Sequence, residues 1–174
     1  MAVMTEQTNN ISEYIISIYR KEDLMRAYQF DLEKFGTQVI NFFPISDKEK
    51  LAEVNHYEEF MQKMKDQGIT EKGHLVEVNE LVKTLSGLHD QLKMDDDDYF
   101  GVYQKALPFI ENNMSHAKGA IRDEIQICLN GIYGFLLLKI AERIIEPEDQ
   151  NMVDRFGDLL SLLSFKYEEQ KASN

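Results

Sequence analysis

Cysteine, proline and glycine are scarce in this chain of 174 residues, which holds 1 Cys, 3 Pro, 9 Gly and no tryptophan. A single cysteine, Cys128, excludes an internal disulfide, and its neighbours Ile127 and Leu129 indicate a small buried hydrophobic residue. The few turn residues, and the lack of short alternating apolar runs, argue against a β-rich fold. We therefore expect an all-α protein.

Positive charge is also in short supply, with 19 Lys and Arg against 31 Asp and Glu and a formal net charge of -12. This charge repels the phosphates of nucleic acids and the head groups of anionic membranes, so we expect neither as a partner. No apolar run approaches the roughly 20 residues that cross a bilayer, and Met1 to Asn10 lacks the apolar stretch of a secretory signal. These features predict a cytoplasmic protein.

Signatures of common enzymes are missing too. The sequence contains no Gly-rich phosphate loop, no Gly-x-Ser-x-Gly turn and no Cys-x-x-Cys pair. The acidic run from Asp95 to Asp98 fails as a calcium loop, because Tyr99 or Phe100 stands where an oxygen ligand belongs. Four carboxylates fit the start of a helix better. We expect no catalytic residue, no cofactor and no metal.

Apolar residues recur every three or four positions through most of the chain, which predicts a bundle of about six helices. We expect one domain over residues 1–174, with disorder at 1–9 and a polar tail at 170–174. The segment 120–146 is apolar on almost every side and is predicted to be the central helix. Within it, Gly131 and Gly134 indicate another helix passing very close.

The other helices have recognisable boundaries. Asn10 fits the N-cap of a first helix that runs through Leu32, until Gly36 breaks it. An apolar connector follows, in which Phe42 and Phe43 are expected to plug the core. Further predicted boundaries are a capping box at Ser46 and Glu49, a helix with a regular stripe over 71–92, a helix starting at Asp98 that Pro108 kinks or divides, and a last helix opened by Pro147.

The first predicted helix carries the strongest candidate site. A period of 3.6 residues places Glu22 within its apolar stripe, with Arg26 four residues on and Gln29 and Tyr19 on adjoining positions. A buried Glu22 to Arg26 pair adds little net stability, so it would point to recognition of a ligand by these four residues. The alternative is that the helix rotates near Arg20 and Glu22 reaches solvent.

Two weaker patterns have plainer interpretations. Glu53 to His56 and Glu71 to His74 both show the Glu-x-x-His spacing of di-iron bundles, but the second copy sits at a glycine-containing helix start, which favours a coincidence of surface residues. Met61 and Met64 fit either an adaptable binding groove or core filler, and we favour core.

The stretch from Asn10 to Asp31, NISEYIISIYRKEDLMRAYQFD, resembles the opening of a small all-helical bacterial family described as a domain of unknown function. The length of the chain and its later apolar helix agree with that resemblance. It implies a helical fold and carries no activity, cofactor or binding residue over to this chain.

Two hypotheses for the function follow. The first is a helical bundle without enzymatic activity that acts through protein association, as a homo-oligomer or with a protein partner, using exposed apolar or Met-rich helix faces. The second is a small-molecule or metal site inside the bundle, built around Glu22 and Arg26.

Overall fold

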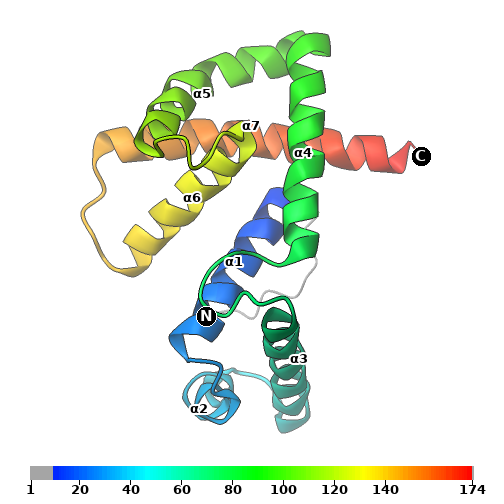
Figure 1. Cartoon of the computed structure of the whole chain (residues 1–174), viewed down its shortest axis with the longest axis vertical. Coiled ribbons are helices and arrows are strands. Elements are labelled where there is room, and N and C mark those ends of the chain that lie inside the picture. Colours follow the sequence, from blue (N-terminus) through cyan, green and yellow to red (C-terminus); the bar gives the residue numbers. More distant parts are fainter. Residues whose placement is uncertain (1–9, 174) are drawn as a thin grey trace. The chain divides into compact units, whose positions relative to one another are not determined.

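The computed structural model describes residues 10–173, and within that range every regular element is a helix (Figure 1). The all-α class is confirmed, with seven α-helices and one short 3-10 helix where about six helices were expected. The disorder expected for residues 1–9 lies outside the described residues. The elements are α1 (Ile11–Ala27), α2 (Leu32–Gln38), η1 (Ile40–Phe42), α3 (Asp47–Asp66), α4 (Val76–Asp95), α5 (Asp97–His116), α6 (Glu124–Ile140) and α7 (Pro147–Ala172).

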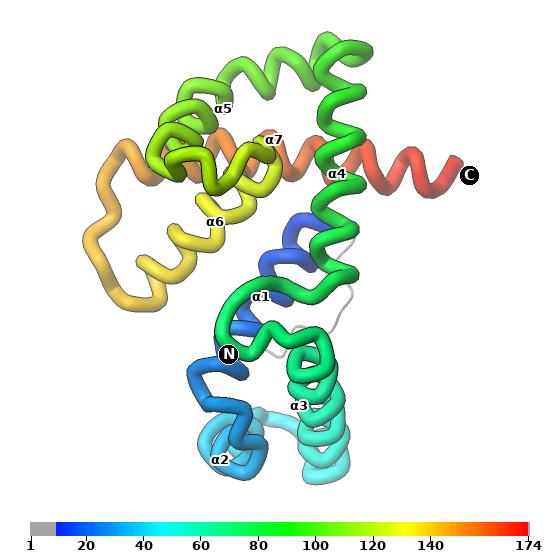
Figure 2. The backbone as a smooth tube through the Cα atoms, viewed as in Figure 1, coloured from blue at the N-terminus to red at the C-terminus, as the bar shows by residue number. Residues whose placement is uncertain are grey.

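The chain forms two compact units, and Figure 2 traces the backbone through both. Among the described residues, the first unit is Ser17–Asn79 and the second consists of 10–16 and 80–173. Helix α1 begins in the second unit and continues in the first, whereas α4 begins in the first and continues in the second. The single domain expected over 1–174 stays a prediction.

The end of α1 corrects the predicted first helix. Helix α1 stops at Ala27 and does not continue through Leu32, because Gln29 and Phe30 adopt the left-handed backbone with φ of 55° and 59°. Neither residue is glycine, so the sequence gives little warning of this turn. The side chain of Asp31 then caps α2 and starts a separate helix.

The connector after α2 also differs from expectation. Gly36 lies inside α2 and does not break it, since a single glycine weakens a helix without preventing it. Phe43 is buried but Phe42 is 80% exposed, so only one of the pair plugs the core. In the core of this unit, the rings of Phe35 and Tyr57 pack edge to face with their centroids 4.7 Å apart.

The start of α3 confirms the predicted capping box. The Ser46 amide donates to Glu49 Oε2 at 2.8 Å, and the Glu49 amide donates to Ser46 Oγ at 3.3 Å. Met61 and Met64 on this helix are buried, which confirms them as core residues. Helix α4 starts at Val76, later than the predicted 71, and its apolar stripe is buried as expected.

In the second unit α5, α6 and α7 pack against one another (Figure 1). The acidic run does start α5, where the Asp96 side chain accepts from the Tyr99 amide at 2.9 Å. Helix α5 runs through Pro108 without being divided. A Cβ atom at Gly131 would lie 2.6 Å from the Phe156 ring, which confirms the expected close approach of another helix there.

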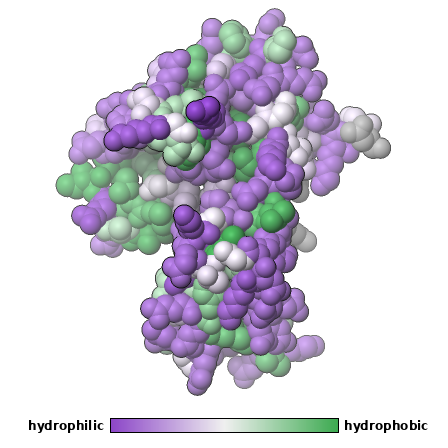
Figure 3. Space-filling model, in the orientation of Figure 1, coloured by the Kyte–Doolittle hydropathy of each residue, from purple (hydrophilic) through white to green (hydrophobic). Residues whose placement is uncertain are grey.

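The predicted central helix is shorter than expected and only partly buried. Helix α6 covers Glu124–Ile140 where 120–146 was predicted, and the space around Gly134 is open within 4 Å. Its first half is buried, but large apolar side chains near its end are exposed. Figure 3 shows hydrophobic surface over this end and the connection to α7, at the left of the view. None of the helices in 10–173 is long and apolar enough to cross a membrane.

Candidate functional site

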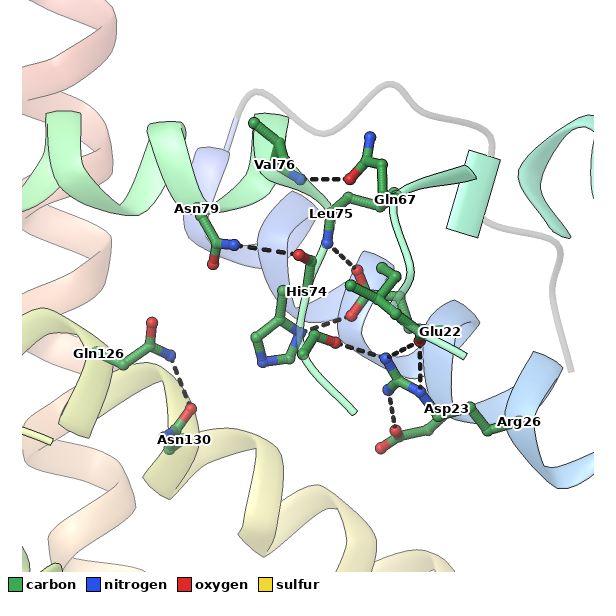
Figure 4. Close-up of polar contacts among 12 residues, drawn as sticks. Glu22, Asp23, Arg26, Gln67, His74, Leu75, Val76, Asn79, Gln126 and Asn130 are labelled. Atoms are coloured by element: carbon green, nitrogen blue, oxygen red, sulfur yellow. Dashed lines mark hydrogen bonds and ion pairs between the residues drawn. The ribbon is translucent and has the colours of Figure 1, made fainter. Parts of the chain in front are cut away.

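Glu22 lies in the middle of α1 with no exposed surface, and its two oxygens accept hydrogen bonds from the chain that precedes α4 (Figure 4). His74 Nδ1 lies 2.6 Å from Glu22 Oε2, and the Leu75 amide donates to Glu22 Oε1 at 2.9 Å. The prediction that Glu22 pairs with Arg26 is therefore wrong, and so is the alternative that Glu22 reaches solvent. The apolar stripe did locate the side chain in the core, but its partners lie some fifty residues away along the chain.

Arg26 binds the loop that leads to His74. Its guanidinium donates to the Ile69 carbonyl, with 3.0 Å from Nη2, and to the Gly73 carbonyl. It also pairs with Asp23, three residues earlier, at 2.9 Å. The cation turns toward these carbonyls because Glu22 already has two donors. Gly73 has a φ of 94°, a conformation that glycine adopts without strain.

Tyr19 and Gln29 have different fates. The buried Tyr19 ring stacks on the His74 ring with centroids 3.8 Å apart and an interplanar angle of 23°. Gln29 is exposed in the left-handed turn after α1 and stands apart from the contacts around Glu22. In the structure, Tyr19, Glu22 and Arg26 thus all contact the loop that precedes α4, and Gln29 does not.

The loop is also held at its ends. The Gln67 side chain accepts from the Val76 amide at 2.8 Å, and the Asn79 side chain donates to the His74 carbonyl at 3.1 Å (Figure 4). These contacts fix the loop and the start of α4. We call these residues, Tyr19, Glu22, Arg26 and His74, the loop clasp.

The two Glu-x-x-His segments do not share a site. His74 is turned to Glu22, whereas His56 Nε2 lies 3.3 Å from Lys21 Nζ. Within residues 10–173, the one group of three His, Cys, Asp or Glu side chains with ligand atoms close together is elsewhere, at His89, Asp90 and Glu124.

His89 is the centre of a second polar cluster that the sequence analysis missed. It is 2% exposed, and its Nδ1 shares a hydrogen bond of 2.6 Å with the Tyr99 hydroxyl. Its Nε2 lies 2.8 Å from Glu124 Oε2. A signal was present, because His89 continues the apolar spacing of Val82 and Leu85 and therefore occupies a core position of α4.

Glu124, at the start of α6, accepts from three side chains. Besides His89, Lys93 Nζ donates to Oε2 at 2.8 Å and the Tyr103 hydroxyl donates to Oε1 at 2.9 Å. Lys93 Nζ also lies 2.9 Å from Asp90 Oδ1. We call the residues His89, Asp90, Lys93, Tyr99, Tyr103 and Glu124 the glutamate hub.

The electrostatics of the glutamate hub keep Glu124 ionised. The hydrogen bond from His89, with those from Lys93 and Tyr103, outweighs burial and lowers the pKa of Glu124 to about 2. Burial, reinforced by Glu124, raises the pKa of Tyr103 to about 12, and burial raises the pKa of Tyr99 far above its usual range. Although burial opposes it, the bonds to Glu124 and Asp90 raise the pKa of Lys93. At neutral pH both tyrosines are therefore neutral and Lys93 is a cation.

Cys128 lies in the buried half of α6. Its side chain is fully buried, and this burial raises the pKa of the thiol well above the usual range. The interpretation of Cys128 as a small buried hydrophobic residue is confirmed.

A family model described as a domain of unknown function (DUF4924) matches residues 1–174. No curated protein and no solved structure matches the chain significantly. The family match agrees with the resemblance of the first helical segment and with the helical fold.

Proposed function

Since the chain belongs to the DUF4924 family, whose description assigns no activity, we propose from its own residues that it associates with a second copy of itself through the end of α6. One observation carries the proposal. Four large apolar side chains are exposed within the segment 137–144, which we call the α6 end patch: Leu137 at 43%, Leu138 at 38%, Ile140 at 55% and Ile144 at 84%. Contiguous exposed apolar surface of this kind favours association with another protein.

The charges along the same segment favour a second copy as the occupant. Lys139, Glu142, Arg143 and Glu146 alternate in sign between the apolar residues. About a twofold axis near positions 142 and 143, Glu142 of one copy can pair with Arg143 of the other, and Arg143 of the first with Glu142 of the second. The net charge of -12 opposes close approach of two copies, so this local pairing is needed for a symmetric contact.

The alternative function, a ligand site around Glu22, Arg26, Gln29 and Tyr19, has no comparable support. Both oxygens of Glu22 accept from donors of the same chain, and Arg26 is engaged by loop carbonyls. These contacts account for the buried carboxylate by its role in fixing the loop.

The oligomeric state of the full chain tests the proposal. We expect light scattering after size exclusion to give a dimer, and the double variant Ile140→Glu with Ile144→Glu to give a monomer with unchanged helical content. The matched control is Met94→Glu, because Met94 is 85% exposed on α4 and lies outside the patch. A monomeric parent protein at its highest soluble concentration would overturn the proposal.

A charge swap tests the choice of a second copy over another partner. Arg143→Glu alone places like charges opposite each other and should weaken the dimer, while adding Glu142→Arg should restore it. If the double swap stays as weak as the single variant, the antiparallel pairing is wrong.

A further inference from the structure

Two carboxylates in the glutamate hub converge on one cation. Lys93 Nζ lies 2.9 Å from Asp90 Oδ1 and 2.8 Å from Glu124 Oε2, and the same Glu124 oxygen lies 2.8 Å from His89 Nε2. His89, Asp90 and Glu124 each offer a ligand atom, and these atoms lie within 4.8 Å of one another. The ammonium of Lys93 thus lies between two carboxylates, and one of these carboxylates also binds the His89 ring.

Two tyrosine hydroxyls form hydrogen bonds to the other polar atoms of His89 and Glu124. The buried Tyr99 hydroxyl holds His89 Nδ1, and the Tyr103 hydroxyl holds the Glu124 oxygen that faces away from Lys93. In metal centres, a ligating histidine is usually oriented through its other ring nitrogen, and a ligating carboxylate is hydrogen-bonded in turn. The hub therefore contains both kinds of supporting contact.

We propose that His89, Asp90 and Glu124 bind a divalent transition-metal ion of the zinc type, which replaces the ammonium of Lys93. Histidine nitrogen and carboxylate oxygen are both ligand types that Zn²⁺ takes, and three protein ligands leave a fourth position open. This site does not depend on the proposed self-association and lies on other residues.

The geometry requires the ligand atoms to move, in addition to the withdrawal of Lys93. Zinc ligands in a tetrahedral site stand about 3.3 Å apart, as follows from metal bonds of about 2.0 Å. His89 Nε2 and Glu124 Oε2 are 2.8 Å apart and share a proton, so these two atoms must separate slightly and release that proton, while Asp90 moves closer to both. The Asp90 side chain is 73% exposed and has room to do so. With the metal on Nε2, the neutral His89 ring carries its proton on Nδ1 and donates it to the Tyr99 oxygen, whereas Nε2 donates to Glu124 when Lys93 is in place.

The charge balance favours the exchange. With Lys93 in place, two carboxylates face a single positive charge, whereas a divalent ion neutralises both. Lys93 is 22% exposed and can withdraw its ammonium to solvent along its flexible stem. Lys93 is therefore a built-in competitor of the metal, which makes its removal a specific test.

Titration of the full chain with Zn²⁺ by calorimetry, and with Co²⁺ by visible absorption, tests the site after treatment with a chelator. We expect one bound ion and the intense bands of tetrahedral Co²⁺. Asp90→Asn should weaken binding and abolish these bands, and Tyr103→Phe should weaken it about 10- to 100-fold. Lys93→Met should tighten binding by about tenfold, because the competing charge is gone.

The control for Lys93 is Lys83→Met, since Lys83 forms an exposed pair with Glu80 on the same helix with the same spacing. We expect no change in affinity for this variant, and circular dichroism checks that each variant keeps its helices. If Co²⁺ stays fully hydrated with the parent protein, or if Asp90→Asn and Lys93→Met bind as the parent does, the metal site is wrong.

Discussion

The loop clasp and the glutamate hub each contain a buried contact between a glutamate and a histidine, but they use it differently. In the first unit, Glu22 accepts from His74 at 2.6 Å and from a backbone amide, and its carboxylate is fully buried. In the second, Glu124 meets His89 at 2.8 Å, binds two further side chains and is 22% exposed. Thus the Glu22 carboxylate binds a backbone amide as well as a side chain, whereas the Glu124 carboxylate binds three side chains.

This difference shows what each arrangement can do. A carboxylate that binds a backbone amide fixes the path of the chain, because this partner cannot leave without a change in the backbone of the loop. A carboxylate that binds Lys93 at the protein surface can exchange that partner for another cation. Burial of an ionisable pair therefore does not by itself indicate a binding site. The identity and mobility of its partners decide whether a ligand can replace one of them.

The largest expected effect comes from Glu22→Ala. It leaves the Leu75 amide and His74 without their acceptor, and we expect the free energy of unfolding to fall by about 3 to 5 kcal/mol. Urea unfolding followed by circular dichroism measures the loss. Glu22→Gln keeps an acceptor for the amide and should lose less. Equal stability of the parent and Glu22→Ala would remove the distinction between the two clusters.

A somewhat smaller effect is expected from pH in the glutamate hub. The pKa of Glu124, about 2 in the folded state, lies below its ordinary value of 4.5, so its contribution is present above about pH 4.5 and lost as the pH falls toward 2. We expect the ionised Glu124 to contribute roughly 3 kcal/mol to the free energy of unfolding at neutral pH.

Denaturant unfolding of the parent and Glu124→Gln at a series of pH values, with a chelator present, checks this. The difference in unfolding free energy between them should shrink as the pH falls. A difference that stays constant from neutral pH to acid would show that Glu124 stabilises the fold without its charge.

The smallest effect is expected for Asp23→Asn. Asp23 is 48% exposed and pairs with Arg26, which keeps its bonds to the Ile69 and Gly73 carbonyls. Solvated pairs of this kind contribute at most about 1 kcal/mol, so unfolding in urea should barely change. A loss as large as that of Glu22→Ala would mean that the exposed ion pair holds the loop as strongly as the buried carboxylate does.

The sequence predicted local features of the fold well. The capping box at Ser46, the acidic start of α5 and the close approach at Gly131 are all present in the structure. The first two depend on residues near one another in the chain, and the third follows from the cost of a glycine inside a helix. The break at Gln29 and Phe30 was missed, since both residues have positive φ and neither is the glycine that usually marks such a position.

The candidate site was predicted only in part. Periodicity placed Glu22 in the core, but helical spacing suggested Arg26 as its partner, when His74 and Leu75 reach it from a distant loop. His89 lies on the predicted apolar stripe over 71–92, but a helical stripe does not identify the partner of a buried histidine. Its partner Glu124 comes from another helix, and no local pattern joins the two.

The buried Cys128 is a natural probe of local unfolding in the second unit. It is the only thiol in the chain, and a thiol reagent reaches it only when the second unit opens. The rate of labelling therefore reports the openings that expose Cys128. Each effect on the glutamate hub can then be followed over time in protein that carries no added probe.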